Sequence, residues 1–112
     1  MEFTKDTSKV LTAIYKIYLE RRKDGIAKKD AIFFKLDFYK NVSSLSSFAE
    51  DDIDDSLLEL SKSDFIKLYI SGNFEIQNSL IIHMENRFKN GIEEVTKYLV
   101  DLAANIVPGL VL

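Results

Sequence analysis

Two features of the sequence predict a mostly helical α+β fold, arranged as one domain over residues 1–112. Apolar residues recur at helical spacing towards both ends of the chain, whereas residues 65–70 are rich in the β-branched and aromatic side chains that favour strands. A chain of 112 residues is long enough to bury one hydrophobic core. No internal repeat or low-complexity linker divides the sequence, so we expect a single domain.

The first helix is expected to span about residues 8–24. Asp6, Thr7 and Ser8 are each suitable N-caps, because a short side-chain oxygen at that position accepts a hydrogen bond from a free backbone N–H. Apolar residues at helical spacing define one face: Val10, Leu11, Ile14, Ile17 and Tyr18. Gly25 follows, and glycine is the residue that most often ends a helix in the left-handed conformation.

Three segments then lead towards the strands. Residues 28–36 are predicted to form a second helix after a short extended piece at 26–27, and residues 37–47 to form a serine-rich loop. A third helix should begin after Ser47, because Ser47 and Glu50 match a capping box, in which each side chain accepts a hydrogen bond from the other residue's N–H. The apolar face of this helix is predicted to contain Ile53, Leu57 and Leu60, with Leu58 beside them.

A β-hairpin is predicted after the third helix, with residues 65–70 as one strand and residues 80–84 as its partner. Turn-forming residues occur at two places between them, at 72–73 and at 78–79. The tip is therefore either residues 71–73 followed by a long return strand, or a wider loop that reaches residue 79. We favour a tip that includes residues 71–73.

The last helix is predicted over residues 89–106 and is a candidate dimerisation element. Its apolar residues are spaced 3, 4, 3 and 4 apart, which is the pattern of a narrow helical seam: Ile92, Val95, Leu99, Leu102 and Ile106. Such a seam packs either on the first helix of the same chain or on a second copy across a two-fold axis. The extra apolar area of Tyr98 and Val100 favours a homodimer. Pro108 and Gly109 are expected to end the helix.

The predicted order is three helices, a two-stranded wing and an added C-terminal helix. This order is typical of the winged helix-turn-helix fold. In helix-turn-helix proteins the recognition helix lies in the major groove of DNA, with its N-terminal residues at the base edges. We therefore interpret residues 1–112 as one winged-helix domain.

The charge of the third helix conflicts with DNA reading. The formal net charge is −3, but residues 1–42 contain 10 basic and 6 acidic side chains, whereas residues 43–64 contain 1 and 7. Five acids open the third helix: Glu50, Asp51, Asp52, Asp54 and Asp55. Because DNA binding depends on neutralising phosphates, binding through this helix is disfavoured. Candidate contacts to the DNA backbone are instead basic residues of the first two helices and the wing: Arg21, Arg22, Lys28, Lys29 and Lys67.

The five acids have two compatible interpretations. Carboxylates in the first turns of a helix interact favourably with its macrodipole, by about 0.3–1 kcal/mol each. The same exposed carboxylates also form a negative patch suited to a basic protein partner. A calcium loop of the EF-hand type would need a D-x-[DN]-x-[DN]-G pattern; residue 53 is Ile and no glycine follows, so we predict no metal site there.

No combination of residues predicts catalysis, a cofactor or a metal centre. The chain has no cysteine and one histidine, His83, which is expected to be an ordinary residue of a strand. A zinc site needs several Cys, His or carboxylate ligands together. One aromatic group is present: Phe33, Phe34, Phe38 and Tyr39. These rings could form a weak stacking platform for single-stranded nucleic acid, but we interpret them as core residues. We predict that the protein is not an enzyme.

Short motifs in the C-terminal half resemble those of known small winged-helix proteins. Ser63-Asp64-Phe65-Ile66-Lys67 is similar to their helix-to-wing junction, and Gly91-Ile92-Glu93-Glu94-Val95 with Tyr98-Leu99 is similar to the helix after the wing. The run Ile106-Val107-Pro108-Gly109-Leu110 is similar to tails in the YjcQ-like family of prophage-encoded winged-helix proteins of Gram-positive bacteria. The resemblance implies a winged-helix fold, a phage or prophage origin and no enzymatic activity. It implies no ligand or catalytic residue, and the acidic third helix departs from a DNA-reading pattern.

The sequence therefore predicts a non-enzymatic regulatory or adaptor module that self-associates as a homodimer and contacts an unidentified protein partner. The alternative is a winged-helix transcription regulator that binds duplex DNA through the basic residues named above. A third interpretation, an acidic mimic of DNA, is disfavoured by a net charge of only −3. The sequence has no signal-peptide character, and no apolar run approaches the roughly 20 residues of a membrane span. We expect a cytoplasmic location and no membrane partner.

Overall fold

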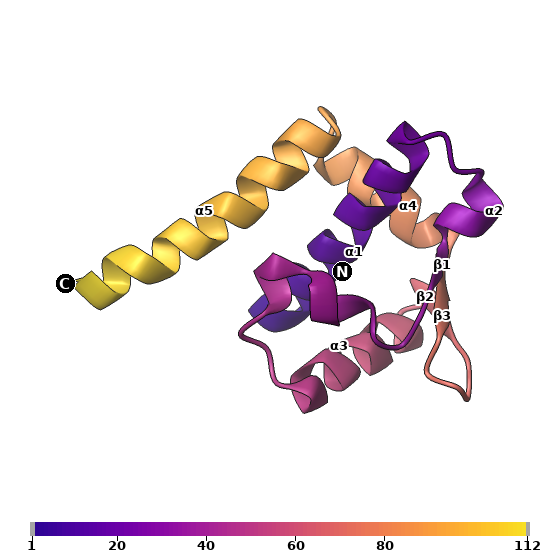
Figure 1. Cartoon of the computed structure of the whole chain (residues 1–112), viewed down its shortest axis with the longest axis horizontal. Coiled ribbons are helices and arrows are strands. Elements are labelled where there is room, and N and C mark those ends of the chain that lie inside the picture. Colours follow the sequence, from indigo (N-terminus) through magenta and orange to yellow (C-terminus); the bar gives the residue numbers. More distant parts are fainter. Residues whose placement is uncertain (1, 112) are drawn as a thin grey trace.

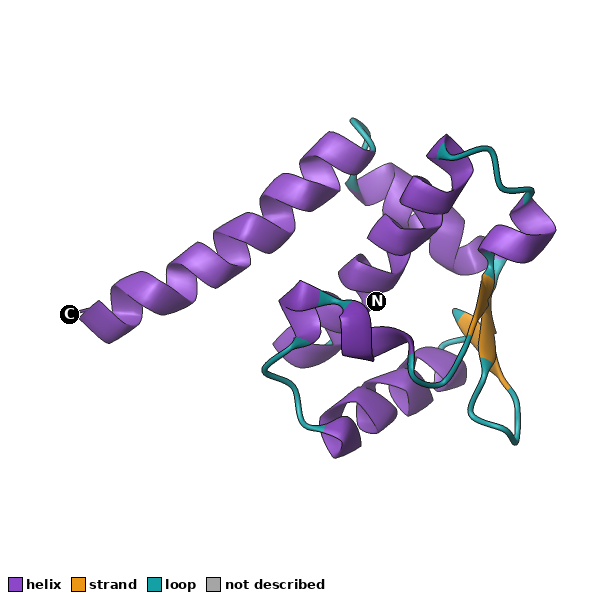
Figure 2. Ribbon diagram, in the orientation of Figure 1, coloured by secondary structure: helices purple, strands orange, loops and turns teal. Residues whose placement is uncertain are grey.

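The computed structural model describes the backbone of residues 2–111 and the side chains of residues 2–101. This part of the chain forms five α-helices, two short 3₁₀ helices and a three-stranded antiparallel sheet, so the fold is mostly helical α+β, as predicted (Figure 1, Figure 2). The elements in chain order are α1 (Lys5–Lys23), α2 (Lys28–Ala31), β1 (Phe33–Phe34), η1 (Phe38–Asn41), η2 (Ser43–Leu45), α3 (Glu50–Lys62), β2 (Ile66–Leu68), β3 (Phe74–Ile76), α4 (Asn78–Arg87) and α5 (Ile92–Val111).

Helix α1 is the centre of the fold and packs against α2, α3, α4, α5 and η2. Its N-cap is Thr4, whose hydroxyl accepts a hydrogen bond from the Thr7 N–H at 3.2 Å. The three predicted N-caps are therefore wrong, because Asp6, Thr7 and Ser8 all lie inside the helix. Gly25 follows the end of α1 as predicted, with a φ of +85° that a glycine adopts without steric cost.

The segment after α2 is a strand, which corrects the helix predicted over residues 28–36. Helix α2 ends at Ala31, and β1 pairs antiparallel with β3, with Phe34 opposite Phe74. The two rings are fully buried and stack with their centroids 5.1 Å apart. The sheet order is β1-β3-β2, so β1 depends on a strand about 40 residues further along the chain. Aromatic residues favour strands, and β3 supplies the partner that these two residues need.

Helix α3 begins at Glu50, and its N-cap, Ala49, makes no side-chain hydrogen bond. The predicted capping box is wrong, because Ser47 lies in the turn after η2, outside the helix. There the Phe48 N–H donates to the Leu45 carbonyl at 3.0 Å and continues the tight 3₁₀ path. The predicted apolar face of the helix is confirmed, because Ile53, Leu57 and Leu60 are buried.

The tip of the hairpin lies at residues 71–73, as favoured from the sequence. The Tyr69 N–H donates to the Asn73 carbonyl at 2.9 Å, and Gly72 has a φ of +92°. The return strand is β3, however, and the strand predicted over residues 80–84 is wrong, because these residues lie in α4. The residues of this segment that are buried share one helical face: Leu80, Ile81 and Met84.

Helix α5 begins after Gly91, later than the predicted residue 89. Gly91 has a φ of +70° and separates α4 from α5. The helix continues to Val111, so the predicted end at Pro108 and Gly109 is wrong. A proline removes one backbone hydrogen bond from a helix, and α5 continues past it.

The first part of α5 packs on the rest of the domain. Val95 and Leu99 are buried, and the helix contacts α1. Beyond residue 101 the helix extends away from the other elements (Figure 1). Among the described residues, no helix has both the length and the apolar character needed to cross a bilayer.

Candidate functional site

The first two turns of α3 present a continuous acidic surface, here named the acidic face. Its five members are all exposed: Glu50, Asp51, Asp52, Asp54 and Asp55. Because Ile53 and Leu57 point into the core, the carboxylates occupy the remaining circumference of the helix. With Ala49 as the N-cap, no side chain caps this end. The free N–H groups and the macrodipole therefore favour the nearby negative charges.

Tyr39 of η1 borders the acidic face. Burial raises the pKa of the Tyr39 phenol, and the carboxylates of Glu50 and Asp54 raise it further. The Tyr39 ring meets Phe38 edge to face at a centroid distance of 5.9 Å. The acidic face is thus flanked by one aromatic hydroxyl, which remains neutral and can donate a hydrogen bond at physiological pH.

A buried polar cluster fixes α3 against α1 and so orients the acidic face. The Thr7 hydroxyl lies 2.9 Å from Glu59 Oε2 and 3.2 Å from the Ser56 hydroxyl. Thr7 and Ser56 are both buried. Because buried polar groups are costly unless they are hydrogen-bonded, this cluster restricts how the two helices can rotate against each other.

Arg21, a predicted DNA contact, joins α1 to β1. Its Nη1 donates hydrogen bonds to the carbonyls of Ala31 at 3.0 Å and Phe33 at 2.7 Å. The guanidinium lies 4.3 Å from the centre of the Phe34 ring. Burial lowers the pKa of the Arg21 guanidinium, and the group remains charged at physiological pH. These contacts engage Arg21 inside the domain.

The other basic candidates lie on the surface. Arg22 donates to the Ile26 carbonyl at 3.0 Å, and Lys28 Nζ donates to Asn78 Oδ1 at 2.8 Å. Lys29 is exposed beside them on α2, whereas Lys67 is exposed on β2, with Nζ 5.4 Å from the Tyr69 ring centre. Three of the candidates therefore surround the turn between α1 and α2, and the fourth belongs to the sheet.

The acidic and basic regions occupy different ends of the molecule. In Figure 1, the start of α3 lies at the lower edge, while the turn between α1 and α2 lies at the upper right. Charges separated by more than about 10 Å are largely screened at ordinary ionic strength. The acidic face and the basic candidates beside the turn between α1 and α2 therefore belong to distinct surfaces.

Several large apolar side chains of the sheet and its loops are exposed, which sequence reasoning missed. The exposed fraction is 39% for Phe33, 51% for Leu36 and 37% for Tyr69, and Ile70 is fully exposed. Phe33 was expected in the core with the other aromatic residues. Only Phe34 of the pair points inward, because neighbouring residues of a strand face opposite sides.

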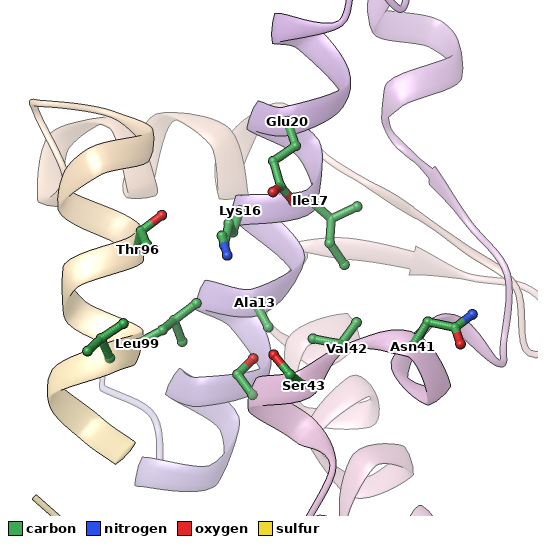
Figure 3. Close-up of a pocket in the computed structure, with 11 residues that line it drawn as sticks. Ala13, Lys16, Ile17, Glu20, Asn41, Val42, Ser43, Thr96 and Leu99 are labelled. Carbon is green, nitrogen blue, oxygen red and sulfur yellow. The ribbon is translucent and has the colours of Figure 1, made fainter. Parts of the chain in front are cut away.

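A groove of about 430 Å³ between α1, residues 41–44 and α5 was also missed (Figure 3). Ala13 and Lys16 of α1 face Thr96 and Leu99 of α5 across it (Figure 3). Both polar and apolar side chains line it. No local pattern indicates this groove, because it forms only where three separate segments meet.

His83 lies on α4, which corrects the predicted strand position. Its ring is 5.2 Å from the Phe65 ring, and burial lowers its pKa below 6.5. In the part of the chain that the structure describes, no group of three or more histidine, cysteine or carboxylate side chains is arranged to hold a metal ion.

Only part of the predicted seam of the last helix lies among the residues whose side chains the structure describes. Val95 and Leu99 are buried, and Ile92 is half-buried. The side chains of Leu102 and Ile106 lie outside the described residues.

Comparisons with protein-family models, with curated proteins and with solved structures found no match to this chain.

Proposed function

We propose that this protein is a non-enzymatic winged-helix regulatory or adaptor module that binds a basic protein partner through the acidic face of α3. The observation that carries the proposal is the clustering of five exposed carboxylates at the start of one helix. Complementary charge speeds association and selects partners more than it adds affinity. A lysine- or arginine-rich surface is the partner chemistry that fits.

The winged-helix assignment is supported by the sheet and by the order of the elements. The strand order β1-β3-β2, with a hairpin directly after α3, is the arrangement expected for a wing. The phage or prophage origin rests on the sequence resemblance alone. In this fold α3 would be the recognition helix, and its charge would repel phosphate.

Self-association is a second part of the proposal. The seam of α5 is buried at Val95 and Leu99 in one copy, and the sequence continues the same spacing to Leu102 and Ile106 beyond the body of the domain. A two-fold dimer would bury the continuing part. Sedimentation equilibrium is expected to give a mass that rises with concentration towards the dimer, whereas a monomer at every concentration would exclude it.

A binding measurement with a basic probe tests the partner chemistry. A labelled oligolysine peptide is expected to bind at low salt, and binding should weaken as salt rises. Binding should be lost in a variant with Asp51, Asp52, Asp54 and Asp55 all replaced by Asn. A matched control removes four exposed acids elsewhere: Asp24→Asn, Glu85→Gln, Glu93→Gln and Asp101→Asn. Equal loss in both variants would mean that only net charge matters, which contradicts the proposal.

The competing function, duplex DNA binding, is favoured by the exposure of Arg22, Lys29 and Lys67. A labelled random duplex is therefore the second probe in the same measurement. Tight binding of the duplex, with a salt slope that falls by about one for each basic residue replaced by alanine, would favour DNA over a basic protein. We expect no such binding.

A further inference from the structure

The groove between α1, residues 41–44 and α5 is an apolar surface next to the helix seam. Its apolar lining includes Ile17, Val42, Leu99 and Val100. Ile17 and Val42 are half-buried, and Val100 is 59% exposed. Since Leu99 belongs to both the groove and the seam, the two surfaces are continuous.

The chain contains a segment whose composition suits this groove. Residues 102–111 include no charged residue and are mostly apolar. They continue α5 as a helix of about 15 Å at a rise of 1.5 Å per residue, and this helix extends away from the body of its own domain (Figure 1). A segment without charge loses no ion solvation when it becomes buried.

We propose that residues 102–111 of one copy occupy the groove of a second copy, and that the exchange is reciprocal. This inference rests on the self-association proposed above and specifies the surfaces involved. A helix that leaves one domain and enters the next gives the same contact twice across a two-fold axis, which closes the assembly at two copies. The occupant is thus the chain itself rather than another protein or a lipid.

The polar residues of the lining are compatible with a helix of this composition. Lys16 and Glu20 of α1 stand at the edge of the groove and point towards the space between the helices (Figure 3). They can keep their charged ends in water while the apolar lining is covered, because long side chains bury their stems and expose their heads. Burial of the uncharged helix therefore requires no new ion pair.

Disulfide trapping tests the contact, and the absence of cysteine from the chain gives a clean background. The Ser43→Cys protein carries its thiol at the groove, and the Ile106→Cys protein carries its thiol on the exchanged helix. An equal mixture, mildly oxidised, is expected to give mainly the mixed dimer. A Ser79→Cys protein is the matched control, because Ser79 is exposed on α4 and does not line the groove.

Each outcome of the trapping experiment decides between specific models. Cross-links only between two Ile106→Cys chains would show a seam-to-seam dimer, which overturns the groove contact but keeps self-association. A cross-link within a monomer of the double variant would show that the helix occupies its own groove, which overturns the exchange. No cross-link, together with a monomer in sedimentation, would exclude both proposals.

A charge substitution gives an independent readout. Val100→Asp places a carboxylate on the wall of the groove, and its short side chain cannot reach water once the exchanged helix covers it. The dimer dissociation constant is therefore expected to rise at least about tenfold, because an unpaired charge is costly to bury. Ile82→Asp is the control, since Ile82 is 56% exposed on α4 and is not part of the groove. Similar dissociation constants for the two folded variants would contradict the proposal.

Discussion

The guanidinium of Arg21 lies 4.3 Å from the centre of the Phe34 ring and anchors the path from α2 into the sheet. Phe34 is fully buried and stacks on Phe74 of the central strand. The same guanidinium binds the carbonyls on either side of the turn, at Ala31 and Phe33. One side chain of α1 thus contacts the last residue of α2 and both residues of β1.

Replacing Arg21 by alanine is expected to lower the free energy of unfolding by about 1–3 kcal/mol, since two carbonyls lose a charged donor and the ring loses a cation contact. Urea denaturation followed by circular dichroism measures the effect. Arg22→Ala is the control, because Arg22 is exposed and donates one hydrogen bond, to Ile26. Equal stability of the two variants would show that Arg21 does not anchor β1.

Replacing Thr7 by valine is expected to destabilise the protein by about 1–3 kcal/mol, because the substitution keeps the shape but removes the hydroxyl that faces Ser56 and Glu59. Chemical denaturation measures the change. Thr96→Val removes a half-buried hydroxyl of α5 and is the control. A Thr7→Val protein as stable as the control would mean that the cluster does not fix α3 against α1.

Two glycine substitutions separate backbone strain from steric contact. Gly72 and Gly25 both have positive φ, so alanine at either position is expected to cost about 1 kcal/mol. At Gly72 the added Cβ would also lie 3.1 Å from the Leu36 Cβ, whereas Gly25 has open space. Thermal unfolding should therefore show a larger loss for Gly72→Ala. The reverse order would contradict the close packing of residue 36 on the hairpin.

His83 is expected to make stability depend on pH. Burial beside Phe65 lowers the pKa of His83 below 6.5, so the folded state binds a proton less readily than the unfolded state. Its contribution is complete above pH 6.5 and is lost as the pH falls through the folded pKa. Unfolding free energies should therefore decrease as the pH falls below 6.5.

Replacing His83 by leucine should flatten this part of the pH profile. Because His83 is the only histidine in the chain, a single imidazole titration in the NMR spectrum reports its pKa directly. A measured pKa above 6.5 would contradict the assigned environment.

Local sequence patterns predicted those features that depend on near neighbours. The buried residues Ile53, Leu57 and Leu60 follow from helical spacing alone, and the hairpin tip follows from the turn preference of Gly72 and Asn73. Exposure of the acidic face follows in the same way, because the apolar positions of α3 leave its carboxylates on the outer side. These properties need no information from elsewhere in the chain.

Elements that depend on distant partners were predicted wrongly. Phe33 and Phe34 have aromatic side chains that favour strands, but a strand of only two residues forms because β3 is available to pair with them. Residues 80–84 suit a strand locally but form a helix, because β3 already supplies the return strand and the spacing of Leu80, Ile81 and Met84 buries one helical face. Short apolar runs are ambiguous between the two periods, and tertiary packing resolves them.

The sequence by itself determined the overall class of the fold, the position of the hairpin tip and the two regions of opposite charge, because each depends on composition or on spacing within one segment. The tertiary structure decided that Arg21 is engaged inside the domain, that Phe33 faces outward and that a groove opens beside α5. Each of these depends on segments brought together from different parts of the chain, and neither spacing nor propensity encodes such contacts locally.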